Sequence, residues 1–394
     1  MKKYNVCGII CEYNPFHNGH KFHVSEARRN SEADYVVAVM SGNFVQRGEP
    51  AILDKWARTE MALKCGVDMV LELPAVYALS SAEYFATGAV DLLQKTGVIT
   101  HISFGSESFE GEVGALELQK IADETLSGPV VNKDSLREGI SFAAASRNSV
   151  VAKPNDVLAT EYLRAINRLN AKMKVLPIRR SGAGHSGEGS AMFIRSLIAN
   201  KKISEVKKYM PAEAFAILQR ELCDGRCPVY SRDFDKIVIA DLRRLGVEGL
   251  RNRPFVSEGL EYKIYDAACR CSTFEELVAE CTSKRYTASR IRRIVFASTL
   301  GILRQNVTAP VPYIRVLGMR RNCGALMDLL QHNASVPVIL SKAKFLHRQE
   351  CAEKNIVTEL FKIENNTADL YSLAFSDSKS RVGATELTHP LIFV

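Results

Sequence analysis

The sequence has no apolar run near the roughly 20 residues that a membrane-spanning helix needs, and it has only one tryptophan in 394 residues. Its N-terminus passes directly into a short apolar segment, without the apolar core and small-residue cleavage site of a secretion signal. Internal repeats and low-complexity tracts are also missing. These absences exclude helical membrane proteins and repeat proteins, and we expect a cytoplasmic protein with no membrane partner.

The ten cysteines form no repeated Cys-x2-Cys pairs, and Cys7, Cys11 and Cys65 lie in segments typical of an apolar core. Buried reduced thiols are therefore a better interpretation than disulfides or a zinc site, and we predict no protein-bound metal. The formal net charge of +8 permits a nucleic-acid partner without demonstrating one. A hydrophobic content of 46% is ample for the cores of two or three domains.

Apolar segments typical of strands alternate with helical segments in the first half of the chain. We expect strands at 6–11, 35–40, 69–73, 101–104 and 174–178, and helices at 19–29, 54–65, 80–96, 156–170 and 190–199. This alternation predicts an α/β Rossmann-like domain with a parallel sheet, which binds ligands at the carboxyl ends of its strands. A mainly helical C-terminal region follows, with weak strands at 311–317 and 336–340. We therefore place domains at 1–200, 201–305 and 306–394, the last a small α/β or helical domain.

Residues 13–20, Tyr-Asn-Pro-Phe-His-Asn-Gly-His, follow the first expected strand and predict a tight turn into a helix. Such turns bind phosphates, because a helix N-terminus offers free N–H groups and a positive dipole end. We predict that His17 and His20 donate hydrogen bonds to a nucleotide α-phosphate and its leaving pyrophosphate, and that Gly19 lets the backbone approach. A chance pairing, or a metal held by His17, His20 and His23, is the alternative.

Polar segments after other expected strands should converge on the same crevice. Ser190 is typical of a helix N-cap, and Arg195 one turn later would complete a pair for the β- and γ-phosphates. The segment 41–48, Ser-Gly-Asn-Phe-Val-Gln-Arg-Gly, fits an acceptor-side loop. The segments 105–107, 153–156 and 178–180 are candidates for this crevice, the last two for adenosine or phosphate contacts. A solvated helix face is the interpretation for Asp54, Lys55 and Arg58.

Residues 284–293, Lys-Arg-Tyr-Thr-Ala-Ser-Arg-Ile-Arg-Arg, are strongly basic and contain no acid. On a helix, Ala288, Ile291 and Val295 form an apolar stripe that leaves the arginines on other faces. Such a run is usually a solvated face, but the missing acids favour contacts with a phosphate backbone.

These motifs carry a resemblance to a known family. The segment 8–20, Gly-Ile-Ile-Cys-Glu-Tyr-Asn-Pro-Phe-His-Asn-Gly-His, resembles the nucleotidyltransferases of the His-x-Gly-His superfamily. Together with residues 41–50, Phe104-Gly-Ser-Glu107, Lys153-Pro-Asn-Asp156 and Gly182-Ala-Gly184, it is similar to the bacterial tRNA(Met) cytidine acetate ligase family. One departure is His185, which follows the glycines where that family is expected to have a Tyr-His pair.

The resemblance implies a reaction in two steps. Acetate attacks the α-phosphate of ATP, with Mg²⁺ offsetting the phosphate charge, and gives acetyl-adenylate and pyrophosphate. The exocyclic amine of the wobble cytidine of elongator tRNA(Met) then takes the acetyl group, which forms N4-acetylcytidine and releases AMP. Residues 1–200 would bind ATP and residues 201–305 would bind tRNA. The alternative is a small-molecule adenylyltransferase of the pantetheine-phosphate or nicotinamide-mononucleotide type, which would not need the basic helical region.

The residues that we assign to these roles fall into four groups. The catalytic residues are His17 and His20. The ATP-binding residues are Gly8, Ile10, Cys11, Glu12, Tyr13, Asn14, Pro15, Phe16, His17, Asn18, Gly19, His20, Gly105, Asn155, Arg179, Arg180, Ser190 and Arg195. The acetate or acceptor loop contributes Asn43, Gln46 and Arg47. The tRNA-binding residues are Lys284, Arg285, Arg290, Arg292 and Arg293.

Overall fold

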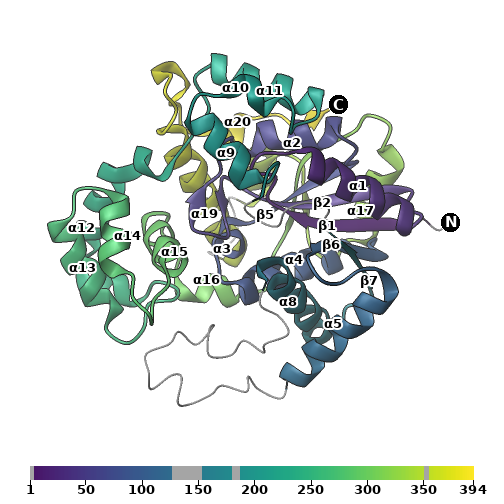
Figure 1. The fold of residues 1–394 in the computed structure, drawn as a ribbon, viewed down its shortest axis with the longest axis horizontal. Helices are drawn as coiled ribbons and strands as arrows, with labels where there is room; N and C mark the ends of the chain where they lie inside the picture. Colours follow the sequence, from purple (N-terminus) through teal and green to yellow (C-terminus); the bar gives the residue numbers. More distant parts are fainter. Residues whose placement is uncertain (1–3, 127–152, 180–186, 350–354) are drawn as a thin grey trace.

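The computed structural model describes residues 4–126, 153–179, 187–349 and 355–394. Its centre is an eight-stranded sheet (Figure 1). The strands of this sheet are β1 (Val6–Cys11), β2 (Tyr35–Ser41), β5 (Met69–Leu73), β6 (His101–Ser106), β7 (Lys174–Arg179), β8 (Ile314–Met319), β9 (Val338–Ile339) and β10 (Ile392–Phe393). A separate hairpin pairs β3 (Phe44–Val45) with β4 (Glu49–Pro50).

The strands predicted in the N-terminal half form one parallel sheet, as expected. β1 lies between β2 and β6, with β5 beyond β2 and β7 beyond β6, all parallel. Alternate residues of β1 enter two different cores: Val6 and Ile10 pack on one face, and Cys7 and Ile9 on the other. A strand buried on both faces reads as a continuous apolar run, which is why these strands were found from the sequence.

Helices cover both faces of this sheet, as Figure 1 shows. On one face lie α1 (Asn18–Asn30), α2 (Lys55–Lys64), α9 (Ala191–Ala199) and α11 (Ala212–Cys223), whose apolar residues share a core. On the opposite face lie α4 (Ala82–Lys95), α5 (Gly111–Leu126) and α8 (Pro154–Leu169). The short helices α3 (Ala75–Ala78) and α10 (Ile203–Val206) connect longer elements.

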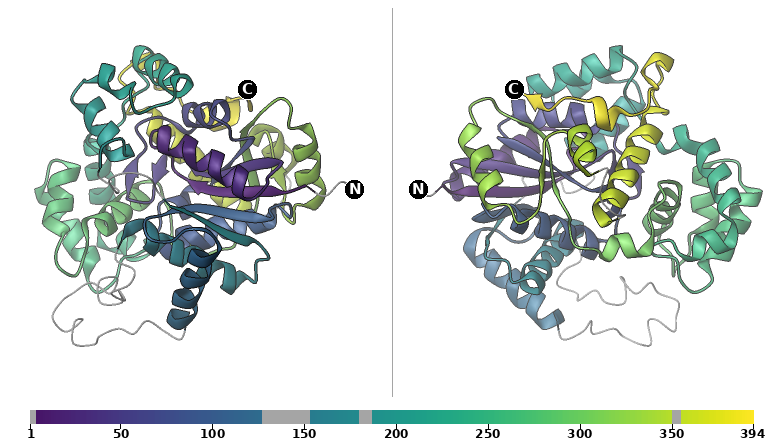
Figure 2. Two further views of the ribbon diagram at one scale, coloured as in Figure 1. Left: turned by 45° about the vertical axis from the view of Figure 1, so that its right-hand side comes forward. Right: turned by 180° about the vertical axis from the view of Figure 1, so that it is seen from behind.

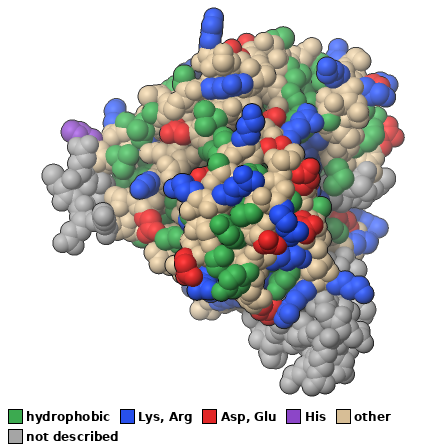
Figure 3. Space-filling view, turned by 90° about the vertical axis from the view of Figure 1, so that its left-hand side faces the viewer, with side chains coloured by type: hydrophobic (Ala, Val, Ile, Leu, Met, Phe, Trp, Pro, Cys, Tyr) green, Lys and Arg blue, Asp and Glu red, His purple; other side chains and the backbone are tan. Residues whose placement is uncertain are grey.

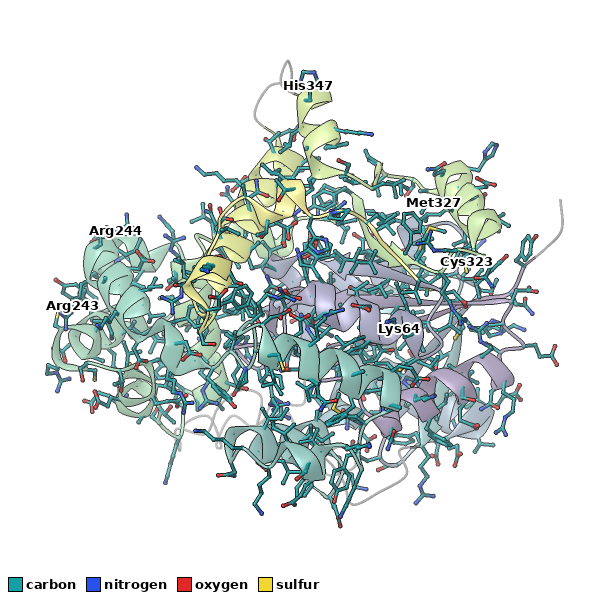
Figure 4. All side chains as sticks on the ribbon, turned by 90° about the horizontal axis from the view of Figure 1, so that it is seen from above. Lys64, Arg243, Arg244, Cys323, Met327 and His347 are labelled. Atoms are coloured by element: carbon teal, nitrogen blue, oxygen red, sulfur yellow. The ribbon has the colours of Figure 1, made fainter. Side chains whose placement is uncertain are left out.

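A helical region packs beside the sheet. It comprises η1 (Ser231–Phe234), α12 (Asp235–Arg251), α13 (Leu260–Arg270), α14 (Phe274–Cys281), α15 (Ala288–Thr299) and α16 (Arg304–Thr308). Seen from above, Arg243 and Arg244 on α12 mark one end of the molecule, and Met327 and Cys323 lie toward the other (Figure 4). No helix in the described ranges is both long and apolar enough to cross a membrane.

The last part of the chain returns to the sheet. Its helices are α17 (Gly324–Asn333), α18 (Lys342–Gln349), α19 (Ile356–Ser372), η2 (Ser378–Ser380) and α20 (Thr385–Thr388). β8 pairs antiparallel with β5, and β9 and β10 pair with β8. Figure 2 shows the yellow C-terminal segment running back beside the sheet. The sheet therefore continues across the boundary that we placed near residue 305.

The described cysteines are free thiols. Most are buried or partly buried, as expected, but Cys223 and Cys269 are exposed. Cys351 lies outside the described residues.

Candidate active site

A cavity of about 980 Å³ opens at the carboxyl edge of the parallel strands. The turn after β1, the loop after β2 and the ends of β6 and β7 line it, and so do residues at the N-terminal ends of α1, α4, α8, α9 and α15. The predicted convergence of these segments on one crevice is therefore confirmed. Helix N-termini bring free N–H groups and positive dipole ends, so the cavity suits a phosphorylated ligand.

The two motif histidines are fixed by the backbone of their own turn. His17 is the N-cap of α1, and its Nδ1 accepts the Gly19 N–H at 3.0 Å. His20 Nδ1 accepts the His17 N–H at 3.3 Å, and the two rings stack with centroids 3.7 Å apart. Because each Nδ1 accepts an N–H, the neutral rings carry their protons on Nε2. Each histidine is thereby set up as an Nε2–H donor, as stabilisation of a charged phosphate requires.

The missing side chain of Gly19 makes room for the His17 ring, in addition to the predicted approach of a phosphate. A Cβ at this position would lie 2.9 Å from His17 Cε1 and 3.1 Å from His17 Nδ1. The missing side chain therefore lets the His17 ring lie against the backbone. Tyr13 packs against the pair, with its ring centroid 4.9 Å from that of His20 in an edge-on arrangement.

Glu12 lies just after the end of β1 and faces the cavity. Its Oε1 accepts the N–H of Gln46 at 2.9 Å. Burial raises the pKa of Glu12 above its usual range, and the Gln46 N–H and the guanidinium groups of Arg47, Arg195 and Arg58 oppose that rise.

Arg58 contradicts the solvated helix face that we expected from the sequence. It is fully buried, and no carboxylate pairs with it in the described part of the chain. Its guanidinium instead donates to four backbone carbonyls, those of Leu53 at 2.9 Å, Glu12 at 2.6 Å, Ser41 at 3.0 Å, and Gly42. Charge alone favoured exposure, but the planar fork of an arginine can satisfy several carbonyls where two strands end. Arg58 thus ties the turn after β1 to the loop after β2.

The neighbouring residues of α2 are also structural. Lys55 is 2% exposed, and its Nζ pairs with Glu72 at 2.5 Å and with Glu386. Asp54 caps α2 by accepting the Ala57 N–H at 2.7 Å. The expected solvated face was therefore wrong for Lys55 and Arg58, whereas Asp54 is partly exposed.

Asn43 belongs to the predicted acceptor loop, residues 41–48, but does not line this cavity. It is buried, its Oδ1 accepts the Lys55 N–H at 2.9 Å and its carbonyl accepts the Ala51 N–H at 2.9 Å. Asn43 therefore holds the loop to the start of α2. Gln46 and Arg47 do line the cavity, and the Arg47 guanidinium forms no hydrogen bond or ion pair with the described residues.

Two of the predicted segments, 105–107 and 153–156, form hydrogen bonds with each other beside the cavity. The Glu107 carboxylate accepts from Asn155 Nδ2 at 2.5 Å and from Asn155 N at 3.1 Å. Asp156 Oδ1 accepts from Ser106 Oγ at 2.5 Å and from Glu107 N at 2.9 Å. These contacts fix the N-terminus of α8 against the end of β6, where Gly105 and Asn155 line the cavity.

The Ser190 and Arg195 pair takes the expected helical positions. Ser190 is the N-cap of α9 and accepts the Phe193 N–H at 3.2 Å. Arg195 Nη1 donates to the carbonyl of Asn14 at 2.9 Å, and burial lowers the pKa of its guanidinium. Asn14 Oδ1 in turn accepts the Ile52 N–H at 2.9 Å. Arg195 therefore braces the histidine turn from α9.

Most of the predicted ATP-binding residues line this one cavity. They are Ile10, Cys11, Glu12, Tyr13, Asn14, His17, Asn18, Gly19, His20, Gly105, Asn155, Arg179, Ser190 and Arg195. Gly8, Pro15 and Phe16 do not line it, and Arg180 lies outside the described residues, as does His185. A Cβ at Gly8 would lie 2.7 Å from Leu93 Cδ2, so Gly8 makes room for helix α4 rather than for a nucleotide.

The predicted basic helix forms only in part, as α15 from Ala288, and Lys284 and Arg285 precede it. The arginines of α15 do not form a single solvated face. Arg292 pairs with Glu49 and with Glu275, both at 3.0 Å, and Arg293 Nη1 donates to the Gln46 carbonyl at 3.1 Å. Burial, with a smaller effect from Arg290, lowers the pKa of Arg293 to about 10. Arg292 and Arg293 thus hold the helical region against the acceptor loop, and both line the cavity.

The other three basic residues lie away from the cavity. Arg290 donates to the Phe255 carbonyl, Arg285 pairs with Glu258 at 2.9 Å, and Lys284 is exposed. Figure 3 views the molecule from this side and shows acidic side chains interspersed among basic ones.

Several residues that line the cavity were not predicted from the sequence. They include Phe22, Glu49, Ser81, Tyr162, Glu188, Tyr209, Thr287 and Ser289. Thr287 carried a local signal, because a threonine before a helical segment is typical of an N-cap, and it caps α15 here. The others depend on which elements become neighbours in the fold.

The alternative of a metal held by three histidines is not supported. His23 Nε2 lies 3.0 Å from Ser103 Oγ, and both Nδ1 atoms of the motif histidines accept N–H groups. Across the described ranges, no group of three His, Cys, Asp or Glu side chains is arranged to hold a metal ion.

The fold and the histidine turn define a nucleotidyltransferase of the His-x-Gly-His class. A family model described as HIGH Nucleotidyl Transferase accordingly matches residues 4–386. The chain is 35% identical to the tRNA(Met) cytidine acetate ligase of Acetivibrio thermocellus, with 99% of this chain and 100% of the relative covered. It is 40% identical to that of Caldanaerobacter subterraneus subsp. tengcongensis, with 98% of each covered. The chain therefore belongs to the tRNA(Met) cytidine acetate ligase family.

Solved structures agree with this assignment. The crystal structure of Thermotoga maritima TmcAL bound with alpha-thio ATP superposes with a TM-score of 0.91 at 32% identity, covering 99% of both chains. The apo form of the same protein gives a TM-score of 0.92. The predicted family, and the predicted α/β fold with a helical C-terminal region, are confirmed.

Proposed function

We propose that this protein is an ATP-dependent acetate ligase that acetylates N4 of the wobble cytidine of elongator tRNA(Met). One observation carries the proposal beyond the relatives: residues of α15 and the histidine turn line the same cavity. A small-molecule adenylyltransferase would not need a helical region at its phosphate site. An enzyme that activates acetate and passes it to an RNA base needs both at one place.

In the first step, a carboxylate oxygen of acetate attacks the α-phosphorus of ATP. The bond from phosphorus to the bridging oxygen breaks, and pyrophosphate leaves with the electron pair. Negative charge grows on the phosphoryl oxygens in the transition state, and the Nε2–H groups of His17 and His20 are the donors suited to stabilise it. Arg47, Arg179 and Arg195 add positive charge around the same cavity.

We assign the rest of ATP to the far wall of the cavity. The adenosine fits beside Gly105 and Asn155, where Glu107 holds the N-terminus of α8. Ser190 and Arg195 on α9 fit the β- and γ-phosphates. Mg²⁺ would enter with the triphosphate, because it is usually held by phosphate oxygens and water with few protein ligands. The lack of a three-ligand cluster within the described residues is consistent with that mode of binding.

In the second step, the cytosine amine attacks the carbonyl carbon of acetyl-adenylate and AMP leaves. We place the acceptor on the side of Gln46, Arg47 and the N-terminus of α15. Exposed Lys284 and Arg285, near the start of the same helix, would contact the phosphates of the tRNA backbone. Because ATP and tRNA are cytoplasmic substrates, we propose that the enzyme acts in the cytoplasm.

The test is to incubate the protein with ATP, labelled acetate and total bacterial tRNA, and to digest the tRNA to nucleosides. We expect the label in N4-acetylcytidine from a single tRNA species, with AMP and pyrophosphate formed in equal amounts. Unlabelled tRNA, together with a dinucleotide formed from ATP and a small acceptor, would refute the proposal and favour an adenylyltransferase.

A further inference from the structure

Three carboxylates line the described part of the cavity, and they differ in their partners. Glu49 pairs with Arg292 at 3.0 Å, and Glu188 accepts a hydrogen bond from the Tyr209 hydroxyl at 2.5 Å. Within the described ranges, Glu12 accepts only the backbone N–H of Gln46, at 2.9 Å through Oε1. Its Oε2 has no hydrogen-bond partner among the described residues.

The surroundings keep Glu12 in place without neutralising it. Arg58 holds its backbone carbonyl at 2.6 Å, and Gln46 holds one carboxylate oxygen. Arg47 from the loop and Arg195 from α9 contribute favourable charge, but neither forms an ion pair with Glu12 in the described structure. The other titratable groups that face it are the Cys11 thiol on β1 and the Tyr162 hydroxyl on α8.

The acetyl-transfer step has a proton to remove. The N4 lone pair of cytosine attacks the acetyl carbon, a nitrogen–carbon bond forms, and the carbon–oxygen bond to the AMP phosphate breaks. The nitrogen gains a bond and must lose a proton to give a neutral amide. A base that removes this proton also assists the attack, because the exocyclic amine is conjugated with the ring and is a weak nucleophile. A positioned base is therefore needed beside the acceptor side of the cavity.

We propose that Glu12 Oε2 is the general base that accepts this proton, an assignment that rests on the function proposed above. The carboxylate becomes a carboxylic acid as AMP leaves with the electron pair, and it then returns the proton to solvent. Burial raises the pKa of this carboxyl, and a base of higher pKa takes a proton more readily. The motif histidines are less suited, because their Nδ1 atoms accept N–H groups and their Nε2 atoms are donors.

The test separates the two chemical steps in the full chain. Acetate-dependent ATP–pyrophosphate exchange reports the first step, and single-turnover transfer from bound acetyl-adenylate to tRNA reports the second. Glu12→Gln keeps an oxygen that can accept the Gln46 N–H but removes the base. We expect it to slow transfer about 100-fold or more and exchange by no more than about tenfold, within the usual range for a lost general base. Glu188→Gln is the matched control, since it makes the same change at a carboxylate in the same cavity, and we expect it to change both steps by a similar factor.

The pH profile gives a second readout that a structural role would not produce. Wild-type transfer should fall as the pH drops through the pKa of Glu12, because the base must be deprotonated. The residual transfer of Glu12→Gln should lose that limb of the profile. Glu12→Asp keeps a carboxylate on a shorter side chain and should restore part of the pH-dependent transfer.

Two results would overturn the proposal. Equal losses of exchange and transfer in Glu12→Gln would assign Glu12 to ATP or its Mg²⁺, and undiminished transfer would assign the base elsewhere. Both leave the proposed function intact. Wild-type protein that performs neither step would instead refute the function itself.

Discussion

Replacing Gly48 with alanine is expected to weaken the contact between the acceptor loop and α15. Gly48 has a φ of +77°, and a Cβ there would lie 2.5 Å from Arg293 N and 2.7 Å from Arg292 Cβ. These atoms belong to the body of a helix and cannot swing aside as the end of a flexible side chain does. A left-handed conformation costs an alanine about 1–2 kcal/mol, and overpacking adds about 1–3 kcal/mol. We therefore expect the free energy of unfolding to fall by about 2–5 kcal/mol, the sum of these two costs.

Gly301→Ala separates strain from steric contact. Gly301 follows the same helix and has a φ of +80°, but no atom of a neighbouring described residue lies within 4 Å of the position that a Cβ would take there. The free energy of unfolding of Gly301→Ala should fall by only about 1–2 kcal/mol, through backbone strain alone. Urea unfolding of both variants measures the difference, and tRNA acetylation should fall further in Gly48→Ala because Gln46 and Arg47 move with the loop. Equal destabilisation by the two variants would refute the tight contact between loop and helix.

Two further predictions concern the histidine turn and the buried charges. Gly19→Ala should slow acetate-dependent exchange about 100-fold, because its Cβ would lie 2.9 Å from His17 Cε1 and displace the ring. The displaced ring would also lose its capping hydrogen bond from the Gly19 N–H, so urea unfolding should show a loss of only about 1 kcal/mol. Burial raises the pKa of Glu364 to about 7, so the folded state holds this proton more tightly than the unfolded state does. The free energy of unfolding should therefore fall as the pH rises from about 4.3 through that value, and Glu364→Gln should remove this fall in urea titrations.

The features that could be predicted from the sequence are those that depend on residues close together in the chain. Apolar runs indicated the parallel strands, because both faces of each strand are buried. The His17–His20 turn indicated one side of the cavity that these strands help to form. The pairing of β8 with β5 could not be predicted, since a weak strand pattern indicates a strand but not which other strand it pairs with. The prediction that Arg58 and Lys55 are exposed was wrong for a different reason. A charged side chain is normally exposed, and only the fold brings together the carbonyls that bind Arg58 and the carboxylates that pair with Lys55. Arg293 likewise points inward because the Gln46 carbonyl lies beside α15.

The two proposed steps make opposite demands on one cavity. Attack on ATP requires positive charge near the phosphates, whereas removal of the amine proton requires a carboxylate that forms no ion pair. An ion pair between Glu12 and Arg195 would defeat both demands, because it would neutralise the guanidinium and occupy the carboxylate. Arg195 instead donates to the Asn14 carbonyl, and Arg58 donates to carbonyls at the strand ends. Backbone oxygens thus orient these arginines without neutralising them. The cavity can therefore hold both the positive charge that the first proposed step requires and the unpaired Glu12 carboxylate that the second requires.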